Sequence, residues 1–498
     1  MSERDTAASA DFDTLASHWD VLVIGAGPAG LTAAATLAAA GRAVLVLDEQ
    51  LAPGGQIYRA VGQSPLTQPT ILGADYWRGR EVVARFARSG ARALAQTSVW
   101  QIDRFEAAPG TPHTLRVAAS SCGRTRLFWA RDVVLAGGAM ERPFPVPGWT
   151  RPGVMGVGAA QVLLKTTGAV PQRATLLAGC GPLLWLYAAQ VLRAGGHIDA
   201  LLDTTAAGQG RRAWPHAMDF LRSPYWRKGL SLMAAVRRRV RVIPGVRTLE
   251  ALGAEGAAGD APLSRVVFTR ADGVRRTLPA DTLLLHQGVV PNTNLASALG
   301  CRLDWDDSQL CWVAQRDRWG QSSLPHVYIA GDGGGIGGAR AAEAQGELAG
   351  WRIAERQGAI DAATCDARAR GARSALRQAL RGRRFLETLY RPADALRLPQ
   401  GDTVVCRCEE VSARQVIDAA QIGCSGPNQL KAFLRCGMGP CQGRFCGLTV
   451  AEMLARHKGR SVADTGYYTL RFPTKPLTLA ELAALPATDA GEKAVVTA

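Results

Sequence analysis

The feature that most constrains the fold is an apolar run near the N-terminus that ends in three closely spaced glycines. The run DVLVI starts at residue 20, the glycines are Gly25, Gly27 and Gly30, and an alanine-rich segment continues to residue 40. This order is typical of a β-strand, a tight turn and a helix, because glycine tolerates backbone conformations that other residues avoid. A second β-like run, residues 43–47, completes a βαβ unit. We therefore expect an α/β protein with parallel strands.

This first glycine turn has the chemistry of a dinucleotide site. Gly25 permits the turn, Gly27 lets the backbone approach a pyrophosphate, and Gly30 lets helix and strand pack closely. The helix N-terminus attracts phosphates, and Asp48, at the end of the next strand, can accept hydrogen bonds from a ribose hydroxyl. A turn with a purely structural role is the alternative. The candidate cofactor-binding residues here are Gly25, Gly27, Pro28, Ala29, Gly30, Asp48, Glu49, Gly55 and Gln56.

Composition places the chain among folded proteins with a sizeable core. Of the 498 residues, 47% are hydrophobic and 20% are charged, which excludes disorder for most of the length. No apolar run approaches the roughly 20 residues of a membrane span, and the N-terminus lacks the pattern of a signal peptide. We therefore expect a cytoplasmic protein, and peripheral attachment to the inner face of the membrane is left open.

The net charge of +16 raises the question of an anionic partner. The densest arginine runs lie among alanines and leucines at helical spacing, with no nucleic-acid signature beside them. We interpret these runs as solvated faces or as a docking surface for an acidic partner protein.

Two further glycine turns follow strand-like runs. The turn Gly179-x-Gly181-x-x-Leu184 has leucine in place of the third glycine, and that side chain would hold helix and strand apart. We therefore do not expect a working NAD(P) site at this turn. The run HVYIA ends in Gly331 and Asp332, where a carboxylate can bind the ribityl chain of a flavin. The alternative for the aspartate is a helix cap.

Six of the eleven cysteines lie between residues 406 and 446. Five of them form the pattern Cys-x-Cys, then Cys-x4-Cys-x4-Cys: Cys406, Cys408, Cys436, Cys441 and Cys446. Two irons bridged by two sulfides need four thiolates, and the glycines among these cysteines allow a loop to wrap tightly. The pattern predicts a [2Fe-2S] site. Zinc is the main rival, although Cys-x-Cys is atypical of zinc sites, and a cluster without metal is the third alternative.

The other cysteines are isolated, which excludes one kind of flavin chemistry. No Cys-x-x-Cys or Cys-x4-Cys pair occurs before residue 436. A redox disulfide that accepts electrons from a flavin needs such a pair, because a thiolate must contact the flavin and a dithiol must form. We therefore expect a flavin in this chain not to reduce a disulfide.

The segments VLVIGAGPAGL, VVLAGGAMERP, VVPNT and VYIAGDGGG resemble the FAD-dependent pyridine-nucleotide-disulfide oxidoreductase superfamily. The resemblance implies two dinucleotide-binding, Rossmann-like domains that are interleaved in sequence. It also implies FAD, with the first glycine turn and Asp48 at its ADP half and Asp332, after Gly331, at its ribityl half.

The segment CRCEEVSARQVIDAA…LKAFLRCGMGPCQGRFC resembles the bacterioferritin-associated ferredoxin-like [2Fe-2S] module. This resemblance implies that the metal ligands are Cys406, Cys408, Cys441 and Cys446. Cys436 remains the reserve candidate for one of these four positions.

From about residue 18 to residue 460 the chain resembles the A-type subunits of opine oxidases, and it is similar to the B subunit of hydrogen cyanide synthase and to the α subunits of dye-linked proline or hydroxyproline dehydrogenases. The resemblance implies a subunit of a heteromeric enzyme whose partner, an amino-acid-oxidase-like FAD subunit, oxidises a secondary amine or amino acid. This chain would relay the electrons to a quinone or other acceptor, and a further small subunit can complete the assembly.

Several alternatives stay open at this point. A self-sufficient NAD(P)H:acceptor reductase is the rival from the same superfamily, and a binding or iron-trafficking protein is the non-enzymatic one. The substrate, the acceptor, the stoichiometry and the presence of FMN at a subunit interface are not determined. No catalytic residue is assigned, and His286, Gln287, Tyr58 and Arg59 are the residues that could face the flavin or merely pack.

The expected domain organisation follows from these motifs. We expect an N-terminal tail (1–17), a first part of the FAD-binding domain (18–150), a second dinucleotide-binding-like domain (151–300), a second part of the FAD-binding domain (301–350), a helical connector (351–400), a small [2Fe-2S] module (401–460) and a C-terminal tail (461–498).

Overall fold

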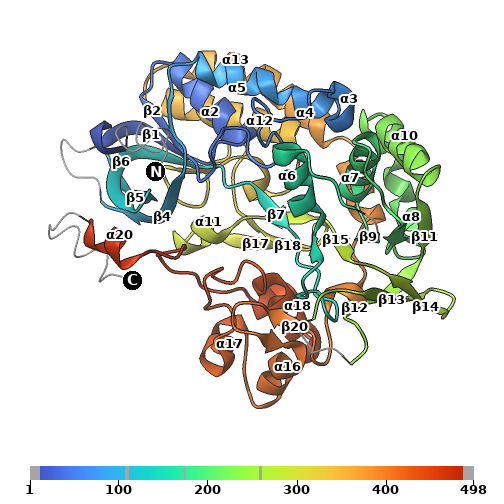
Figure 1. The fold of residues 1–498 in the computed structure, drawn as a ribbon. Helices are drawn as coiled ribbons and strands as arrows, with labels where there is room; N and C mark the ends of the chain where they lie inside the picture. Colours follow the sequence, from blue (N-terminus) through green and yellow to red (C-terminus); the bar gives the residue numbers. More distant parts are fainter. Residues whose placement is uncertain (1–11, 107–111, 173, 257–260, 486–498) are drawn as a thin grey trace.

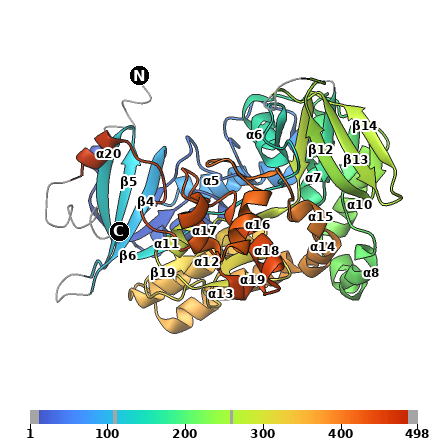
Figure 2. The ribbon, with the colours of Figure 1, turned by 90° about the horizontal axis from the view of Figure 1, so that it is seen from below.

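The computed structural model describes residues 12–106, 112–172, 174–256 and 261–485, and the structural statements below refer to these residues. It is a mixed α/β molecule with two Rossmann-like sheets, which confirms the expected fold class. Figure 1 shows the two sheets side by side, with the C-terminal segment that carries the cysteines below them. Seen from below, in Figure 2, this segment lies across the junction between the two sheets.

The first sheet collects strands from both halves of the chain. Its strands are β1 (His18–Ile24), β2 (Val44–Leu47), β3 (Arg92–Leu94), β4 (Thr97–Arg104), β5 (Leu115–Ser121), β6 (Arg124–Leu135) and β19 (Val327–Ile329). The order is β3-β2-β1-β6-β5-β4, and β19 also pairs with β6. β1 is parallel to β2 and β6, whereas β4, β5 and β6 form an antiparallel meander. Because β19 returns to this sheet after the second sheet has been completed, the two domains are interleaved.

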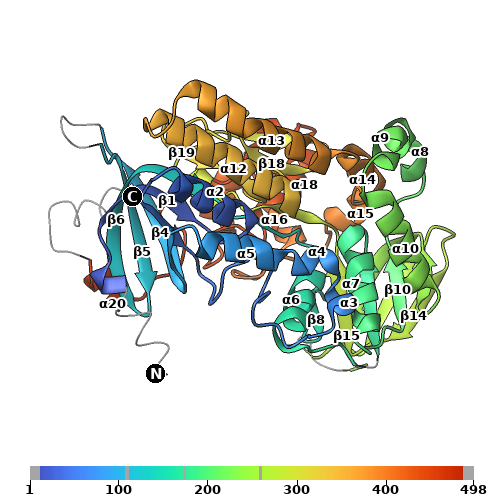
Figure 3. The same ribbon diagram turned by 90° about the horizontal axis from the view of Figure 1, so that it is seen from above.

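Two helices pack closely on the first sheet, and Figure 3 shows them from above. They are α2 (Pro28–Ala39) and α12 (Ala339–Arg356). A Cβ on Gly346 would lie 2.1 Å from the carbonyl oxygen of Ala29, so only glycine fits at the crossing. A Cβ on Gly331 would lie 2.9 Å from the Cβ of Ala29. The helix crossing therefore brings the first and third glycine turns together.

The second sheet is fully parallel. Its strands are β8 (Val154–Gly156), β9 (Thr175–Gly179), β10 (Ala200–Asp203), β11 (Arg241–Pro244) and β15 (Thr282–His286), in the order β11-β10-β9-β15-β8. Around it lie α6 (Val157–Thr167), α7 (Pro182–Arg193), α10 (Tyr225–Arg237) and an antiparallel sheet of β12 (Val246–Leu252), β13 (Arg265–Arg270) and β14 (Arg275–Pro279). An antiparallel ribbon of β7 (Ala139–Glu141) and β16 (Val289–Pro291) joins this domain to the first.

The segment expected to form a helical connector, residues 351–400, is divided into separate helices after the end of α12. The structure has α13 (Ala362–Leu380), α14 (Arg383–Leu389) and α15 (Asp394–Arg397). The break lies at Gly382, whose φ of 75° is left-handed and cannot continue a right-handed helix. The amide of Gly382 donates to the Asp219 carboxylate at 2.6 Å, and this contact fixes the turn.

The cysteine module has its own apolar core. It contains β20 (Val404–Cys406), β21 (Val411–Ser412), α16 (Ala413–Gln421), α17 (Pro427–Leu434) and α18 (Gly447–Lys458). Ser412 caps α16 and Gln415 reciprocates, which fixes the helix start. Tyr468 and Leu470, from the segment after residue 460, are buried in the same core. The chain therefore remains packed on the module beyond its last long helix.

The other elements are mostly short. They are α3 (Pro69–Leu72), α4 (Ala74–Trp77), α5 (Gly79–Ala87), α8 (Gln209–Ala213), η1 (Trp214–His216), α9 (Ala217–Leu221), α11 (Asn294–Ala298), β17 (Leu303–Asp306), β18 (Cys311–Ala314), η2 (Gly331–Gly334), α19 (Val462–Thr465) and α20 (Leu479–Ala483). Among the helices that the structure describes, none combines the length and the apolar character required to span a membrane.

Candidate cofactor sites

The first glycine turn leaves backbone exposed where side chains would collide. Gly25 has a φ of 109°, and a Cβ on Gly30 would lie 1.9 Å from the carbonyl oxygen of Gly25. Gly30 is therefore required by packing within the turn. Pro28 occupies the first turn of α2, and its missing amide proton removes no helical hydrogen bond there.

A second glycine pair approaches the first turn from the loop after β2. A Cβ on Gly55 would lie 2.8 Å from the Cα of Gly27, and the amide of Gly54 donates to the carbonyl of Ala26 at 2.8 Å. A Cβ on Gly27, in contrast, would meet only the Cα of Gly55, at 3.9 Å. The absence of a side chain at Gly27 is thus not required by the protein's own packing. The space beside Gly27 fits the predicted close approach of a pyrophosphate to this backbone.

Asp48 is oriented by the turn that it faces. Its Oδ2 accepts from the amide of Ala26 at 2.5 Å and its Oδ1 accepts from the amide of Gln50 at 2.7 Å. Burial raises the pKa of the Asp48 carboxyl, and the two amides oppose that shift. Each oxygen keeps a lone pair for a ribose hydroxyl, so the arrangement fits the predicted role.

The two other predicted residues near this loop are held by neighbouring segments. Glu49 accepts from the Ser98 hydroxyl at 3.3 Å and pairs with Lys475. Gln56 has an exposed side chain, and its carbonyl accepts from the Lys165 ammonium at 3.0 Å. Both residues lie on the rim of the first glycine turn, where the structure leaves side-chain groups accessible.

One carboxylate oxygen of Asp332 accepts hydrogen bonds from the local backbone, and the other remains available as an acceptor. Its Oδ1 accepts from the amides of Gly337 and Gly338, both at 2.8 Å, just before α12 begins. Within the described residues its Oδ2 accepts no hydrogen bond. Burial lowers the pKa of the nearby Arg316, and the charge of Asp332 opposes that shift. The capping and the ligand interpretations of Asp332 are therefore compatible, because they use different oxygens.

The second glycine turn is covered by other parts of the chain. Leu184, in the place of the third glycine, is buried, and His286 lies beside Gly181. The Cys180 thiol donates to the carbonyl of Tyr390 at 3.5 Å. Burial raises the pKa of Tyr390 to about 12, and the nearby charge of Asp203, at the end of β10, raises it further. The connector thus lies over the strand ends where a nicotinamide nucleotide would bind in a fold of this class.

The candidate residues near the junction of the two domains form hydrogen bonds with other groups of the protein. The Nδ1 of buried His286 lies 2.6 Å from a carboxylate oxygen of Glu141, which also accepts from the amide of Gly158. The Gln287 side chain donates to the carbonyl of Pro143 at 2.6 Å. Tyr58 donates to Glu343 at 3.0 Å. These contacts occupy the groups named, whereas the side-chain oxygen of Gln287 is buried without a hydrogen-bond partner.

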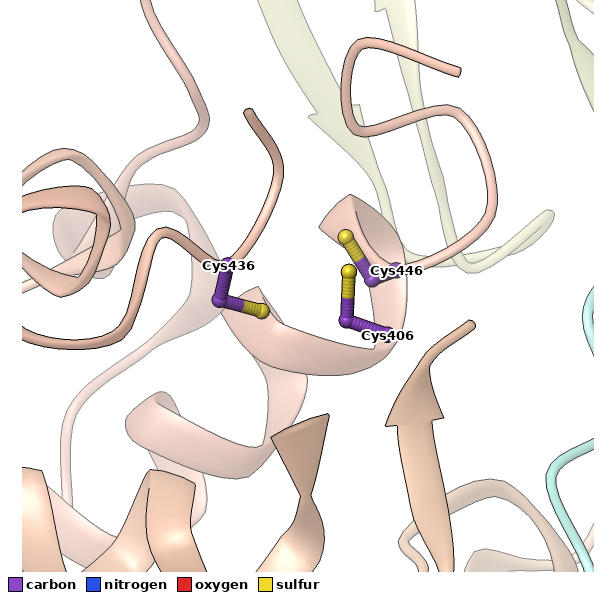
Figure 4. A group of neighbouring side chains, drawn as sticks. All are labelled: Cys406, Cys436 and Cys446. Atoms are coloured by element: carbon purple, nitrogen blue, oxygen red, sulfur yellow. The ribbon is translucent and has the colours of Figure 1, made fainter. Parts of the chain in front are cut away.

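Three cysteines converge in the core of the module. The sulfur atoms of Cys406, Cys436 and Cys446 all lie within 4.8 Å of one another, and Figure 4 shows their side chains directed toward a common centre. All three residues are buried. Hydrogen bonds from Cys436 and Cys446 lower the pKa of the Cys406 thiol to about 2. The same hydrogen bonds with Cys406 raise the pKa of Cys436 and of Cys446, so the three sulfurs share protons in this structure. Three buried sulfur atoms that converge in this way fit the ligands of a metal cluster.

The other two cysteines form a second group beside the first. Burial raises the pKa of Cys441, and a hydrogen bond with the Cys408 side chain adds to the shift. A Cβ on Gly439 would lie 2.3 Å from the Cβ of Cys408, so glycine is needed for the loop to close over this cysteine. Cys408 is exposed and Cys441 is half-buried. The donor set therefore fits a cluster that has one buried and one more accessible side.

The module is bonded to both dinucleotide-type domains. The Asn294 amide donates to the carbonyl of Gln442 at 3.1 Å, and the Trp149 indole donates to the carbonyl of Val404 at 2.7 Å. Glu452, on α18, forms buried ion pairs with Arg142 and Arg397. These contacts hold the cysteine site against the segments that leave the first domain.

Three functional candidates carry no motif and were missed by sequence reasoning. Lys165 is buried and donates to Gln56, Ile57 and Gln161. Its only signal was that it is the one charged residue of α6. Arg316 lies behind Asp332, and the Tyr468 hydroxyl donates to the Cys436 sulfur at 3.5 Å. Neither has a sequence signal, because neither belongs to a motif.

The chain matches two family models. Residues 19–180 and 231–354 match the pyridine nucleotide-disulphide oxidoreductase family. Residues 400–485 match the sarcosine oxidase A3 domain. The first match covers both glycine-rich domains, and the second covers the cysteine module with the segment that follows it.

Curated relatives match nearly the whole length. The A-type subunit of opine oxidase from Rhizobium meliloti is 44% identical, over 99% of this chain and 92% of its own length. The HcnB subunit of hydrogen cyanide synthase from Pseudomonas aeruginosa is 32% identical, over 92% of this chain and 96% of its own length. The crystal structure of L-proline dehydrogenase from P. horikoshii has a TM-score of 0.69 at 20% identity, over 93% of this chain and 79% of that chain, which shows a shared fold.

Proposed function

The chain belongs to the pyridine nucleotide-disulphide oxidoreductase family, in the group of the A-type opine oxidase subunits, and we propose that it is the electron-transferring subunit of a heteromeric enzyme that oxidises opines or other secondary amines. The proposed cofactors are FAD in the first domain and a [2Fe-2S] cluster in the cysteine module. Bound FAD accepts electrons in pairs and releases them singly, and the cluster carries them one at a time.

The observation that carries this proposal is the set of buried contacts between the cysteine module and the segments that adjoin the first domain. Asn294 lies on α11, directly after the ribbon that leaves the first domain, and its amide bonds the loop between Cys441 and Cys446. Glu452, in the helix that Cys446 caps, is buried between Arg142 and Arg397. An electron-transferring subunit needs its two redox sites held at a constant separation, and contacts that attach the module to the rest of the chain support this role.

A self-sufficient NAD(P)H reductase is less well supported. Leu184 replaces a glycine of the second turn, and the connector reaches the same turn through Tyr390. A nicotinamide nucleotide would have to displace this segment to bind there. The reducing equivalents are therefore proposed to come from a partner subunit, an amino-acid-oxidase-like flavoprotein, and to leave to a quinone or another acceptor. An FMN between subunits and a further small subunit are compatible with this assembly.

The purified chain, alone and with its partner subunit, tests the proposal. We expect a bound flavin absorbance, an EPR signal of a reduced [2Fe-2S] cluster, and reduction of both centres by amine substrate only when the partner is present. NADPH should leave the flavin oxidised. Loss of both cofactor signals in soluble protein, or rapid flavin bleaching by NADPH in the isolated chain, would contradict it.

The proposed metal ligands are Cys406, Cys408, Cys441 and Cys446. We assign Cys408 and Cys441, which share a hydrogen bond, as the ligands of one iron. Cys406 and a neighbouring buried thiol are then the ligands of the other iron. The Cys436 sulfur lies within 4.8 Å of the Cys406 sulfur, as the Cys446 sulfur does, and Cys436 is the alternative to Cys446.

Single serine variants decide between these two thiols. Cys441→Ser is expected to abolish the reduced-cluster EPR signal, because it removes the partner of Cys408. Cys446→Ser should do the same, whereas Cys436→Ser should retain a signal. The isolated Cys365→Ser is the matched control, since Cys365 lies outside the module. A signal that survives Cys446→Ser and disappears in Cys436→Ser would exchange the two ligands.

A further inference from the structure

An exposed apolar face lies at one end of the second domain. α8, η1 and α9 follow one another without a gap, and they place Trp214, Met218 and Leu221 four and three residues apart. This spacing puts the three side chains on one face of a helical run. They are 75%, 62% and 50% exposed. Figures 1 and 3 show α8 at the end of the molecule opposite the meander of the first sheet.

The opposite face of the same run is already used. Ala213 is fully buried, and the Phe220 ring stacks on Phe385 of α14 with centroids 4.3 Å apart. Asp219 accepts from the amide of Gly382. The run is thus anchored to the connector by its inner side. Within the described residues, the three outer apolar side chains stay largely uncovered, so their exposure is not a consequence of a loose helix.

The surroundings of this face are strongly basic. Residues 209–241 contain nine lysines and arginines and a single acidic residue, Asp219, which is engaged with the Gly382 amide and faces Arg381 at 3.9 Å. Nearby Asp75, from the first domain, is shared between Lys228 and Arg340. We define the basic stripe as the exposed residues Arg211, Arg212, Trp214, Met218, Leu221 and Arg222.

We propose that the basic stripe binds the surface of an anionic phospholipid bilayer. Tryptophan favours the interface between water and acyl chains, and guanidinium groups are attracted to anionic headgroups. The aliphatic side chains decide between possible anionic partners. Met218 and Leu221 gain free energy by entering the acyl region, whereas nucleic acid and acidic peptides offer little apolar surface to them. An amphipathic basic helix of this kind lies in the plane of the membrane surface.

The inference is independent of the proposed enzymatic function, because lipid binding requires no turnover and no cofactor. It also suits that function, since a subunit held at a membrane meets acceptors that are dissolved in lipid. The two can fail separately, as the binding is measured without substrate.

Flotation of the full chain with lipid vesicles tests the proposal. We expect binding to vesicles that contain phosphatidylglycerol, loss of binding at high salt, and no binding to pure phosphatidylcholine.

Arg211→Glu with Arg212→Glu should weaken binding by at least about tenfold, since each basic residue near the surface contributes substantially. Trp214→Ser with Met218→Ser should weaken it while preserving the salt dependence. Arg370→Glu with Arg377→Glu, exposed on α13, is the matched charge control and should bind like the native chain.

Either of two results overturns the proposal. The first is a native chain that does not float with anionic vesicles although it is folded and soluble. The second is equal loss in the α13 control, which would indicate that net charge alone is responsible. Because all four stripe positions in these variants are exposed, unchanged far-ultraviolet circular dichroism should accompany the loss of binding.

Discussion

At the scale of the residue, Lys165 shows how a side chain without a motif can organise a cofactor loop. Its ammonium donates to the carbonyls of Gln56 and Ile57 at 3.0 and 3.1 Å and to the Gln161 side chain at 3.0 Å. It belongs to α6 of the second domain, whereas Gln56 and Ile57 belong to the loop beside the first glycine turn. One side chain therefore couples the two domains at the rim of the proposed FAD site.

Replacement of Lys165 by methionine keeps the length of the side chain and removes its donors. We expect the free energy of unfolding to fall by about 1–3 kcal/mol, because two backbone carbonyls lose their partner. FAD should also dissociate faster as the loop loosens. Urea unfolding and flavin release measure the two effects. Thr167→Ala, on the exposed surface of the same helix, should leave both unchanged, and an unaltered flavin affinity in Lys165→Met would contradict the coupling.

The same lysine predicts a pH dependence with a definite sign. Burial lowers the pKa of Lys165 from 10.5 to about 7. Above pH 7 the unfolded chain binds a proton that the folded chain has released, so this group makes stability rise with pH, by at most about 1.4 kcal/mol per pH unit. Burial raises the pKa of Cys180 from 9.0 to about 12, and this opposes the rise above pH 9. Between pH 7 and 9, the urea midpoint should therefore climb more steeply in the native chain than in Lys165→Met.

At the scale of the element, packing and ligand binding in the first glycine turn depend on different glycines. Gly30→Ala would place a Cβ 1.9 Å from the carbonyl oxygen of Gly25, whereas Gly27→Ala would place one 3.9 Å from its nearest neighbour, at an ordinary φ of −79°. We expect Gly30→Ala to lower the melting temperature by several degrees, by the mechanism of an overpacked core. Gly27→Ala should leave the melting temperature of the flavin-free chain unchanged and weaken FAD binding.

Flavin content after gel filtration, together with melting curves of the flavin-free chain, distinguishes these two effects. Gly62→Ala, at a position with no atoms near its Cβ, is the control for both. If the Gly27→Ala variant retained FAD with native affinity, the proposal that a pyrophosphate lies against the Gly27 backbone would be wrong.

Local elements of this kind are what the sequence predicts best. The strand, the glycines and the helix of the first turn are adjacent in the chain, so periodicity and turn chemistry are sufficient. The connector is the counterexample. Composition predicts that this segment is helical but not where its helices end, and Gly382 takes a left-handed φ that separates α13 from α14. The contact between Cys180 and Tyr390 could not be predicted at all, because no local pattern links two residues so far apart.

At the scale of the whole molecule, the arrangement of the cysteine module depends on tertiary contacts that spacing does not encode. The pattern identified the five clustered cysteines, but it could not tell which of them share a centre. The structure groups Cys406 with Cys436 and Cys446, and it buries Tyr468 against this group. Sequence reasoning likewise found both glycine-rich domains and the module, whereas the ion pairs that join them come from residues without a motif.

Glu452 is the clearest of these joining residues. It is buried on α18 with Arg142, from the loop after β7, and Arg397, from α15. Arg142 is only 4% exposed, and this burial lowers its pKa to about 10. Removing the carboxylate would leave the buried Arg142 without its counter-charge, whereas Arg397 would keep its pair with Asp394. Breaking a buried pair by removing one partner costs about 3–5 kcal/mol.

We therefore expect Glu452→Gln to release the module from the two sheets without unfolding it. Limited proteolysis should cut the connector or the residues near 400 much faster in the variant, because the exposed linker is no longer held by α18. Electron transfer between the two proposed centres should slow as their separation fluctuates, while each centre keeps its own spectrum. Asp402→Asn, which removes an exposed pair with Arg414 inside the module, is the matched control and should be cut like the native chain. Equal cleavage of Glu452→Gln and the native chain would mean that the apolar contacts around Trp312 and Tyr467 are sufficient to hold the module in place.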